Sequence, residues 1–224
     1  MPEDPLARTV PFMTDHSTSM RTWRLRAAAA GGLCLAAMVI AGIALGDRVP
    51  PLDTWIVGHL YSRPETAPAT VATVISGAGT IVGLVLLLAA AAALLRRWRA
   101  GSARLLPRHG VLLVACLATV ALQAAFRRPG PPVTSQDWTY PSGHVTVLAA
   151  LAFTAFVISL ELTAAWRATV LAASVTTLAA VSASRVTLGE HYLVDVVAAL
   201  FATVGAGLLA VAALNLRPRH RVPG

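Results

Sequence analysis

The stretch Val71–Leu95, VATVISGAGTIVGLVLLLAAAAALL, contains no charged residue and decides what kind of fold the chain can adopt. A helix needs about 20 apolar residues to cross the hydrocarbon core of a bilayer, and this stretch is long enough. The whole chain of 224 residues is 56% hydrophobic and 12% charged, about half the charge of an ordinary soluble domain. This composition excludes a disordered chain, a disulfide-stapled secreted miniprotein and an ordinary cytosolic enzyme, and it indicates an integral membrane protein.

Six apolar stretches of this kind are separated by polar segments along the chain. We predict that each forms a helix, so that the fold is all-α, a six-helix transmembrane bundle. The third, fourth and fifth stretches are short and reach full membrane thickness only with their flanking turns. The stretches are Ala27–Leu45, Val71–Leu95, Gly110–Phe126, Val145–Leu160, Ala168–Ala183 and Tyr192–Leu214.

The domain division follows from these stretches, which leave no room for a second globular domain. The bundle is assigned to residues 27–216. Residues 1–26 are expected to be a loose cytoplasmic tail because Pro, Ser, Thr and acidic residues gather near the start. Residues 217–224 are expected to be a basic cytoplasmic tail. Ala44-Leu45-Gly46 resembles a signal-peptide cleavage site, but the long polar segment before the first stretch favours a retained anchor.

The basic residues indicate the orientation of the bundle. All 18 are Arg, and they lie in short runs at the ends of apolar stretches. With the N-terminus in the cytoplasm, most of them fall on the inner side, as the positive-inside rule requires. We therefore predict a multi-pass protein of the cell membrane with both termini cytoplasmic, and the net charge of +8 does not indicate a nucleic-acid partner. The arginines left on the outer side are Arg48, Arg63, Arg127, Arg128 and Arg185.

Two connecting segments carry the residue types of an oxyanion site. Arg127–His144 joins the third stretch to the fourth, and Ser184–His191 joins the fifth to the sixth. Two crossings separate these segments, so both lie on the same side, and the active site is expected at the external membrane surface. The residues brought together there are Arg127, Arg128, Ser142, Gly143, His144, Arg185, His191 and Asp195.

The chemistry of this cluster suits a phosphate. His144 and His191 are each predicted to begin a helix, where free N–H groups and a partial positive charge favour an anion. Gly143 permits close backbone approach, and Ser142 offers a hydroxyl. Asp195 lies four residues after His191 on the same helical face, so its carboxylate can hold Nδ1–H and leave Nε2 as a nucleophile. An acid within an apolar helix also implies a partner, because an unpaired charge there is costly.

Two blocks of sequence match the signature of a known family. They are Pro141-Ser142-Gly143-His144 and Ser184-Arg185, the latter followed by His191 and Asp195 with both gaps correct. From about Ala69 to Leu214 the chain resembles the type-2 phosphatidic acid phosphatase and vanadium haloperoxidase superfamily, in its membrane-bound lipid phosphatase branch. Haloperoxidase chemistry is not expected, because those relatives are soluble.

The first signature block departs from the family pattern, which is Lys, six residues and then Arg-Pro. In one register Gln123 stands for the Lys and Gly130 for the signature Arg. In the other register Arg128-Pro129 is kept and Ala121 stands for the Lys. At least one phosphate-binding cation is missing in either register. Arg127 is the candidate substitute, and Gln123 can donate a hydrogen bond without a charge.

The resemblance implies a two-step hydrolysis that uses no metal and no cofactor. His191 would attack phosphorus while Asp195 stabilises the imidazolium, and His144 would protonate the leaving oxygen and then activate water. The remaining residues that the resemblance and the local sequence assign to phosphate binding are Arg128, Arg185, Ser142, Gly143, Arg127 and Gln123.

The expected partners are the bilayer and a lipid phosphate whose apolar tail lies among the helices. Undecaprenyl diphosphate and other polyprenyl diphosphates, phosphatidic acid and phosphatidylglycerol phosphate all fit, and no oligomeric state is predicted. Two alternatives stay open. One is a weak or silent lipid-phosphate binder or carrier of the same fold, which the missing Lys favours. The other is a phosphotransferase that passes the phosphoryl group to an alcohol.

Two details outside the motifs complete the sequence predictions. The external segment Asp47–Pro68 carries Trp55, Ile56, Leu60 and Tyr61, which indicate either an interfacial amphipathic patch over the site or an ordinary aromatic belt. Glu190 precedes His191 and is expected to disfavour an anion unless it turns away.

Overall fold

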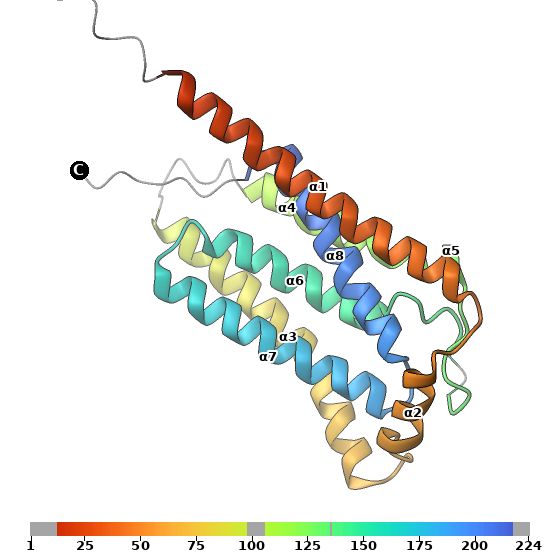
Figure 1. The fold of residues 1–224 in the computed structure, drawn as a ribbon. Helices are drawn as coiled ribbons and strands as arrows, with labels where there is room; N and C mark the ends of the chain where they lie inside the picture. Colours follow the sequence, from red (N-terminus) through yellow and green to blue (C-terminus); the bar gives the residue numbers. More distant parts are fainter. Residues whose placement is uncertain (1–12, 98–105, 135, 217–224) are drawn as a thin grey trace, which may run out of the picture.

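A computed structural model describes residues 13–97, 106–134 and 136–216, and over these ranges the chain forms helices without a strand (Figure 1). The all-α prediction is confirmed for this part of the chain. The elements are α1 (Met13–Leu45), α2 (Pro51–Leu60), α3 (Ala67–Arg97), α4 (Leu106–Leu117), the 3₁₀ helix η2 (Ala118–Ala121), α5 (Leu122–Phe126), α6 (Gly143–Ser159), α7 (Ala164–Thr187) and α8 (Leu193–Leu214).

Five segments in the described residues are long and apolar enough to cross a membrane. They lie in α1, in α3, in the continuous run Leu106–Phe126 that joins α4, η2 and α5, in α7 and in α8. The sixth predicted stretch corresponds to α6, which has 17 residues and spans about 26 Å at 1.5 Å per residue. This length falls short of a hydrocarbon core of about 30 Å. The structure therefore supports a multi-pass membrane protein with five candidate spans, where the sequence predicts six.

The short helix α6 occupies the middle of the bundle. It packs against α3, α4, α7 and α8, and Figure 1 shows it between these neighbours. Its residues Ala150, Ala155 and Ile158 are almost completely buried. Because neighbouring helices cover α6, its length is not set by contact with lipid.

The predicted loose tail is only partly correct. Residues 13–26, assigned to that tail, are helical and continue into the apolar part of α1. Adding residues to an existing helix avoids the cost of nucleation, so a polar extension follows the apolar segment readily. Arg24 secures this extension, because its Nε donates to the carbonyl of Ala212 at 3.0 Å. Residues 1–12 and the predicted basic tail 217–224 lie outside the described residues.

The outer faces of the long helices are apolar. Leu33 and Ile43 of α1 are 73% and 72% exposed, and Ile81 of α3 and Val175 of α7 are also exposed. Large exposed apolar surfaces mark an interaction site when they occur on a protein in water. Distributed along the long helices, they are the surface expected in contact with lipid.

The helix ends that carry the motifs gather at one end of the bundle, opposite the first turns of α1 (Figure 1). The N–H of Ser142 donates to the carbonyl of Asp195 at 3.0 Å, which joins the start of α6 to α8. The helix α2 lies at the same end, where the N–H of Ser62 donates to Thr187 at 2.9 Å. Ile56 of α2 is buried in a cluster with Val145, Val186, Val196 and Ala199. The predicted convergence of the two motif segments is thus present, and α2 is packed onto it.

Candidate active site

His144 and His191 line one cavity of about 560 Å³. His144 is in the first turn of α6, whereas His191 lies in the connection between α7 and α8, just before the N-cap residue Tyr192. His191 is buried and His144 is exposed at this opening. The other lining residues are Thr80, Val120, Gln123, Gln136, Asp137, Trp138, Gly143 and Val147.

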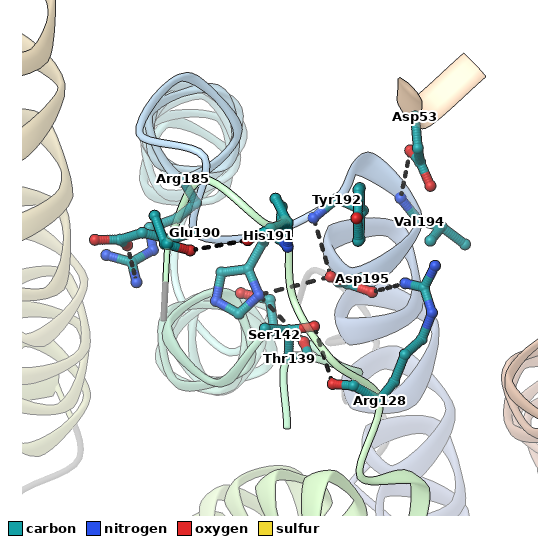
Figure 2. A network of polar contacts seen from close by, with 12 residues as sticks. Asp53, Arg128, Thr139, Ser142, Arg185, Glu190, His191, Tyr192, Val194 and Asp195 are labelled. Carbon is teal, nitrogen blue, oxygen red and sulfur yellow. Dashed lines mark hydrogen bonds and ion pairs between the residues drawn. The ribbon is translucent and has the colours of Figure 1, made fainter. Parts of the chain in front are cut away.

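The orientation of His191 is set by a backbone carbonyl. Its Nδ1 lies 3.1 Å from the carbonyl oxygen of Thr139, and Figure 2 shows the ring held between this loop and α8. A carbonyl can only accept, so Nδ1 carries the proton in this contact and Nε2 keeps its lone pair. The predicted partner Asp195 is farther away, with Oδ2 3.8 Å from Nδ1. The carboxylate interacts with the imidazole through charge and does not make the direct hydrogen bond predicted from the spacing.

Asp195 is fully buried and has two stronger partners. Its Oδ1 accepts from Nη1 of Arg128 at 2.6 Å. Its Oδ2 accepts from the N–H of Tyr192 at 3.0 Å, which caps the start of α8. The buried acid therefore has the partner that its position in an apolar helix predicts, and this partner is an arginine from the loop after α5.

Arg128 does not lie where the sequence analysis expects a phosphate ligand. It is 2% exposed and is absent from the cavity lining. Nη2 donates to the carbonyl of Arg48 at 2.9 Å, and the guanidinium lies 4.9 Å from the ring centre of Tyr192. In the described part of the chain its Nε has no hydrogen-bond partner. The buried carboxylate of Asp195 is the strongest local attraction for this cation, so the guanidinium turns away from the cavity.

Arg185 is also held by a carboxylate. Nη2 forms an ion pair with Glu190, and Nη1 donates to the hydroxyl of Ser76 at 3.2 Å. The Arg185 side chain is 6% exposed, whereas that of Glu190 is 23% exposed. The position of Glu190 is thereby explained, because it neutralises Arg185 on one side of His191 (Figure 2). Within the described lining of the cavity itself, neither Arg nor Lys occurs.

Gly143 and His144 at the start of α6 line the cavity together with Gln123 of α5. A Cβ placed on Gly143 would lie 3.1 Å from Oε1 of Gln123, a tight contact that a larger residue could keep only if the amide shifted by a few tenths of an ångström. Ser142 is buried, and in the described residues its hydroxyl has no hydrogen-bond partner. Gly143 and Gln123 thus line the cavity, whereas Ser142 is not among its lining residues.

Arg127 contacts a residue of the cavity wall. It is the C-cap of α5 in the left-handed conformation, with φ of 49°. Its Nε donates to the carbonyl of Ala124 at 3.1 Å, and its guanidinium lies 5.6 Å from the ring centre of Trp138, a lining residue. Arg127 is exposed, so this cation, unlike Arg128, remains accessible.

Two parts of the site were missed by the sequence analysis. The loop residues Thr139 and Trp138 supply the carbonyl that orients His191 and a wall of the cavity. Asp53 of α2 is buried beside α8, and its Oδ1 accepts from the N–H of Val194 at 3.4 Å. Asp53 could have been noticed in the sequence, because it is a carboxyl group among the apolar residues of α2. No sequence signal distinguishes the carbonyl of Thr139.

The chain was compared with protein families, curated proteins and solved structures. The PAP2 superfamily model matches residues 110–219, which include His144, His191 and Asp195. No curated protein and no solved structure gives a significant match. Members of this superfamily are phosphatases, which supports phosphatase activity on phosphate esters. The predicted resemblance is confirmed: the match to the PAP2 superfamily covers residues 110–219, the part of the chain that carries the two histidines and the buried acid.

Proposed function

We propose that this protein hydrolyses a membrane lipid phosphate or a polyprenyl diphosphate through a phosphohistidine intermediate on His191. The observation that carries the proposal is the meeting of His144 and His191 in one cavity of about 560 Å³. Each histidine comes from a different signature block, and the cavity also receives the start of a helix, which favours an anion.

In the first step Nε2 of His191 attacks phosphorus, and the bond between phosphorus and the leaving oxygen breaks. The orientation set by Thr139 leaves the Nε2 lone pair available for this attack. His144 donates its proton to the leaving oxygen. In the second step His144 takes a proton from water, which attacks phosphorus and breaks the P–N bond, releasing phosphate and His191.

The phosphoryl oxygens are proposed to bind at the start of α6. The N–H of Gly143, the amide of Gln123 and His144 are the donors at this place. Arg127, exposed next to the lining residue Trp138, would bind a second phosphate group or those oxygens of the phosphate that face solvent. Arg185 would contribute if Glu190, its partly exposed partner, gave way to the substrate.

The site is proposed to lie at the outer membrane surface, with both termini in the cytoplasm. The asymmetric distribution of arginines supports this orientation. A lipid substrate would keep its tail against the apolar helix faces while its phosphate enters the cavity. In this arrangement α6 serves as a sixth, shorter crossing.

One observation favours a second candidate function, a silent lipid-phosphate binder or carrier. Both guanidiniums expected on the phosphate, those of Arg128 and Arg185, are paired with carboxylates. A site with neutralised cations would bind a phosphate more weakly and stabilise its transition state less. Such a protein would bind lipid phosphate without turnover.

The deciding experiment is phosphate release by the purified protein in detergent from phosphatidic acid, phosphatidylglycerol phosphate and undecaprenyl diphosphate, in the presence of EDTA. We expect release by the wild type and loss of at least about 10³-fold in His191→Ala, because the nucleophile is removed. His59→Ala, an exposed histidine on α2, is the matched control and should retain activity. Wild-type binding without release would support the carrier, and full activity of His191→Ala would exclude the phosphohistidine mechanism. Adding an alcohol tests the phosphotransferase alternative through its product.

A further inference from the structure

A groove of about 670 Å³ lies between α1 and α8. It is formed by the first turns of α1 and the end of α8, so it lies at the end of the bundle opposite the signature blocks (Figure 1). Its described lining does not include His144 or His191, and the groove is therefore a feature separate from the candidate active site. The lining residues are Arg21, Arg24, Leu25 and Ala28 of α1, Leu209, Ala212 and Ala213 of α8, and the C-cap residue Asn215.

The two walls of this groove are held in place by contacts between α1 and α8. A Cβ placed on Gly31 would lie 2.7 Å from the carbonyl oxygen of Gly205, so glycine at position 31 allows the two backbones to approach closely. Nearer to the start of α1, Nε of Arg24 donates to the carbonyl of Ala212 at 3.0 Å. The groove is thus bounded by helices whose backbones are fixed relative to each other.

The polar part of the groove is positively charged. Arg21 and Arg24 are both exposed, and neither Asp nor Glu occurs in the described lining. Over the described ranges of the chain, neither arginine forms an ion pair. Guanidinium groups match the oxygens of a phosphate in charge and geometry, so two of them without a neutralising acid favour the binding of a phosphate group.

The apolar part of the groove continues along the surface of α1. Leu25 lines the groove and is 60% exposed, and Leu33, Ile40 and Ile43 farther along the helix are exposed as well. Because an α-helix turns about 100° per residue, these side chains fall within about 80° of one another around α1. They form an apolar stripe that begins beside the two arginines. This is the arrangement expected for a ligand with an anionic head and an apolar tail.

We propose that the groove binds an anionic phospholipid of the leaflet at that end of the bundle. Its phosphate contacts Arg21 and Arg24, and one acyl chain follows the stripe of α1 that begins at Leu25. The apolar stripe favours a lipid over a free phosphate, which would use the arginines alone. In the proposed orientation this leaflet is the cytoplasmic one. The inference does not depend on the proposed hydrolysis, because the candidate active site takes no part in it.

The test measures lipid binding to the full chain in an uncharged detergent by native mass spectrometry. Phosphatidylglycerol is the anionic probe, and phosphatidylcholine is the zwitterionic comparison. Phosphatidylglycerol is a phosphodiester and lies outside the proposed substrates, so binding is measured apart from turnover. We expect phosphatidylglycerol to bind at least about fivefold more tightly, the gain that one basic residue gives at an anionic membrane surface. Equal affinity for the two lipids would overturn the proposal.

Two variants of α1 separate the groove from general electrostatic attraction. Arg21→Gln removes a charge from the groove and leaves the contact of Arg24 with Ala212 in place, so phosphatidylglycerol should bind about fivefold more weakly. Arg26→Gln removes an exposed arginine of the same helix that is outside the described lining, and it should bind like the wild type. Equal losses in the two variants, or no loss in Arg21→Gln, would reject the groove as the site.

A third variant tests the shape of the groove without changing its charge. Ala213→Phe places a large side chain at an exposed lining position and keeps both arginines. We expect weaker binding of phosphatidylglycerol and an unchanged melting temperature without lipid. Inorganic phosphate, added as a competitor to the wild type, should not displace the lipid. Wild-type affinity in Ala213→Phe, or displacement of the lipid by inorganic phosphate, would contradict a phospholipid site.

Discussion

Two arginine–carboxylate pairs flank His191, and they differ in how far they are buried. In the Arg128–Asp195 pair both side chains are almost inaccessible, at 3% and 0% exposure. In the Arg185–Glu190 pair the arginine is buried, but the acid is 23% exposed. Figure 2 shows one pair on each side of the histidine.

The difference indicates which arginine an anionic substrate can recruit. Separating Arg128 from Asp195 would leave a charge buried without compensation, which is strongly unfavourable. Separating Glu190 from Arg185 is expected to cost less, because the Glu190 side chain as a whole is 23% exposed, although the oxygen that meets Arg185 is buried. The first pair therefore belongs to the framework of the site, and under the proposed function the second is the pair that we expect a phosphate to separate.

The largest expected effect comes from removing the cation of the fully buried pair. Arg128→Ala leaves Asp195 buried without its ion-pair partner, so we expect the free energy of unfolding to fall by about 3–5 kcal/mol. Denaturant or thermal unfolding in detergent measures the loss. Arg63→Ala, which removes an exposed arginine, is the control and should change stability little. A stable Arg128→Ala protein that has lost only substrate affinity would place Arg128 on the phosphate instead of in the framework.

A smaller effect is expected from supplying the cation that the cavity lacks. Gln123→Lys introduces a charge beside Gly143, and a charge-assisted hydrogen bond contributes about 1.5–3 kcal/mol. We expect kcat/KM to rise about 10-fold in the phosphate-release assay.

Gln136→Lys adds the same charge to a different wall of the cavity and serves as the control for a general electrostatic effect. An equal gain in both variants would mean that only the net charge of the cavity matters. No gain in Gln123→Lys would show that the existing donors, Arg127 included, already suffice.

The smallest effect is expected at the partly exposed pair. Glu190→Gln removes the acid that neutralises Arg185, so KM for a lipid phosphate should fall about threefold while kcat changes less. The expected change is modest because partly exposed ion pairs are weak. Glu65→Gln, an exposed acid before α3, is the control. A higher KM in Glu190→Gln would show that Glu190 holds Arg185 in its binding position.

Much of the fold could be predicted because hydropathy acts locally. The apolar stretches appear as helices, and Val71–Leu95 lies within α3, Ala67–Arg97. The boundaries moved where local signals were weak: α1 extends back to Met13, and α6 ends one residue before the predicted Leu160. Polar residues next to an apolar helix become helical by extending it, and their composition alone does not predict this extension.

The candidate site was predicted less completely. The spacing of the motifs and the parity of the crossings predicted that His144 and His191 meet, and in the structure both line one cavity. The motifs also predicted that Arg128 binds the phosphate, whereas in the structure Arg128 forms an ion pair with Asp195. Asp53 was missed because its contact with Val194 joins residues 141 positions apart.

By itself, the sequence determined the membrane class, the helical segments, the signature blocks and the end of the bundle at which they meet. These follow from composition and from spacing along the chain, which are local properties. Only the tertiary structure decided which carboxylate holds which arginine, which atom orients His191 and that α2 contributes a buried acid. Each of these is a competition between groups distant in sequence, and its outcome depends on distance and burial in the folded protein.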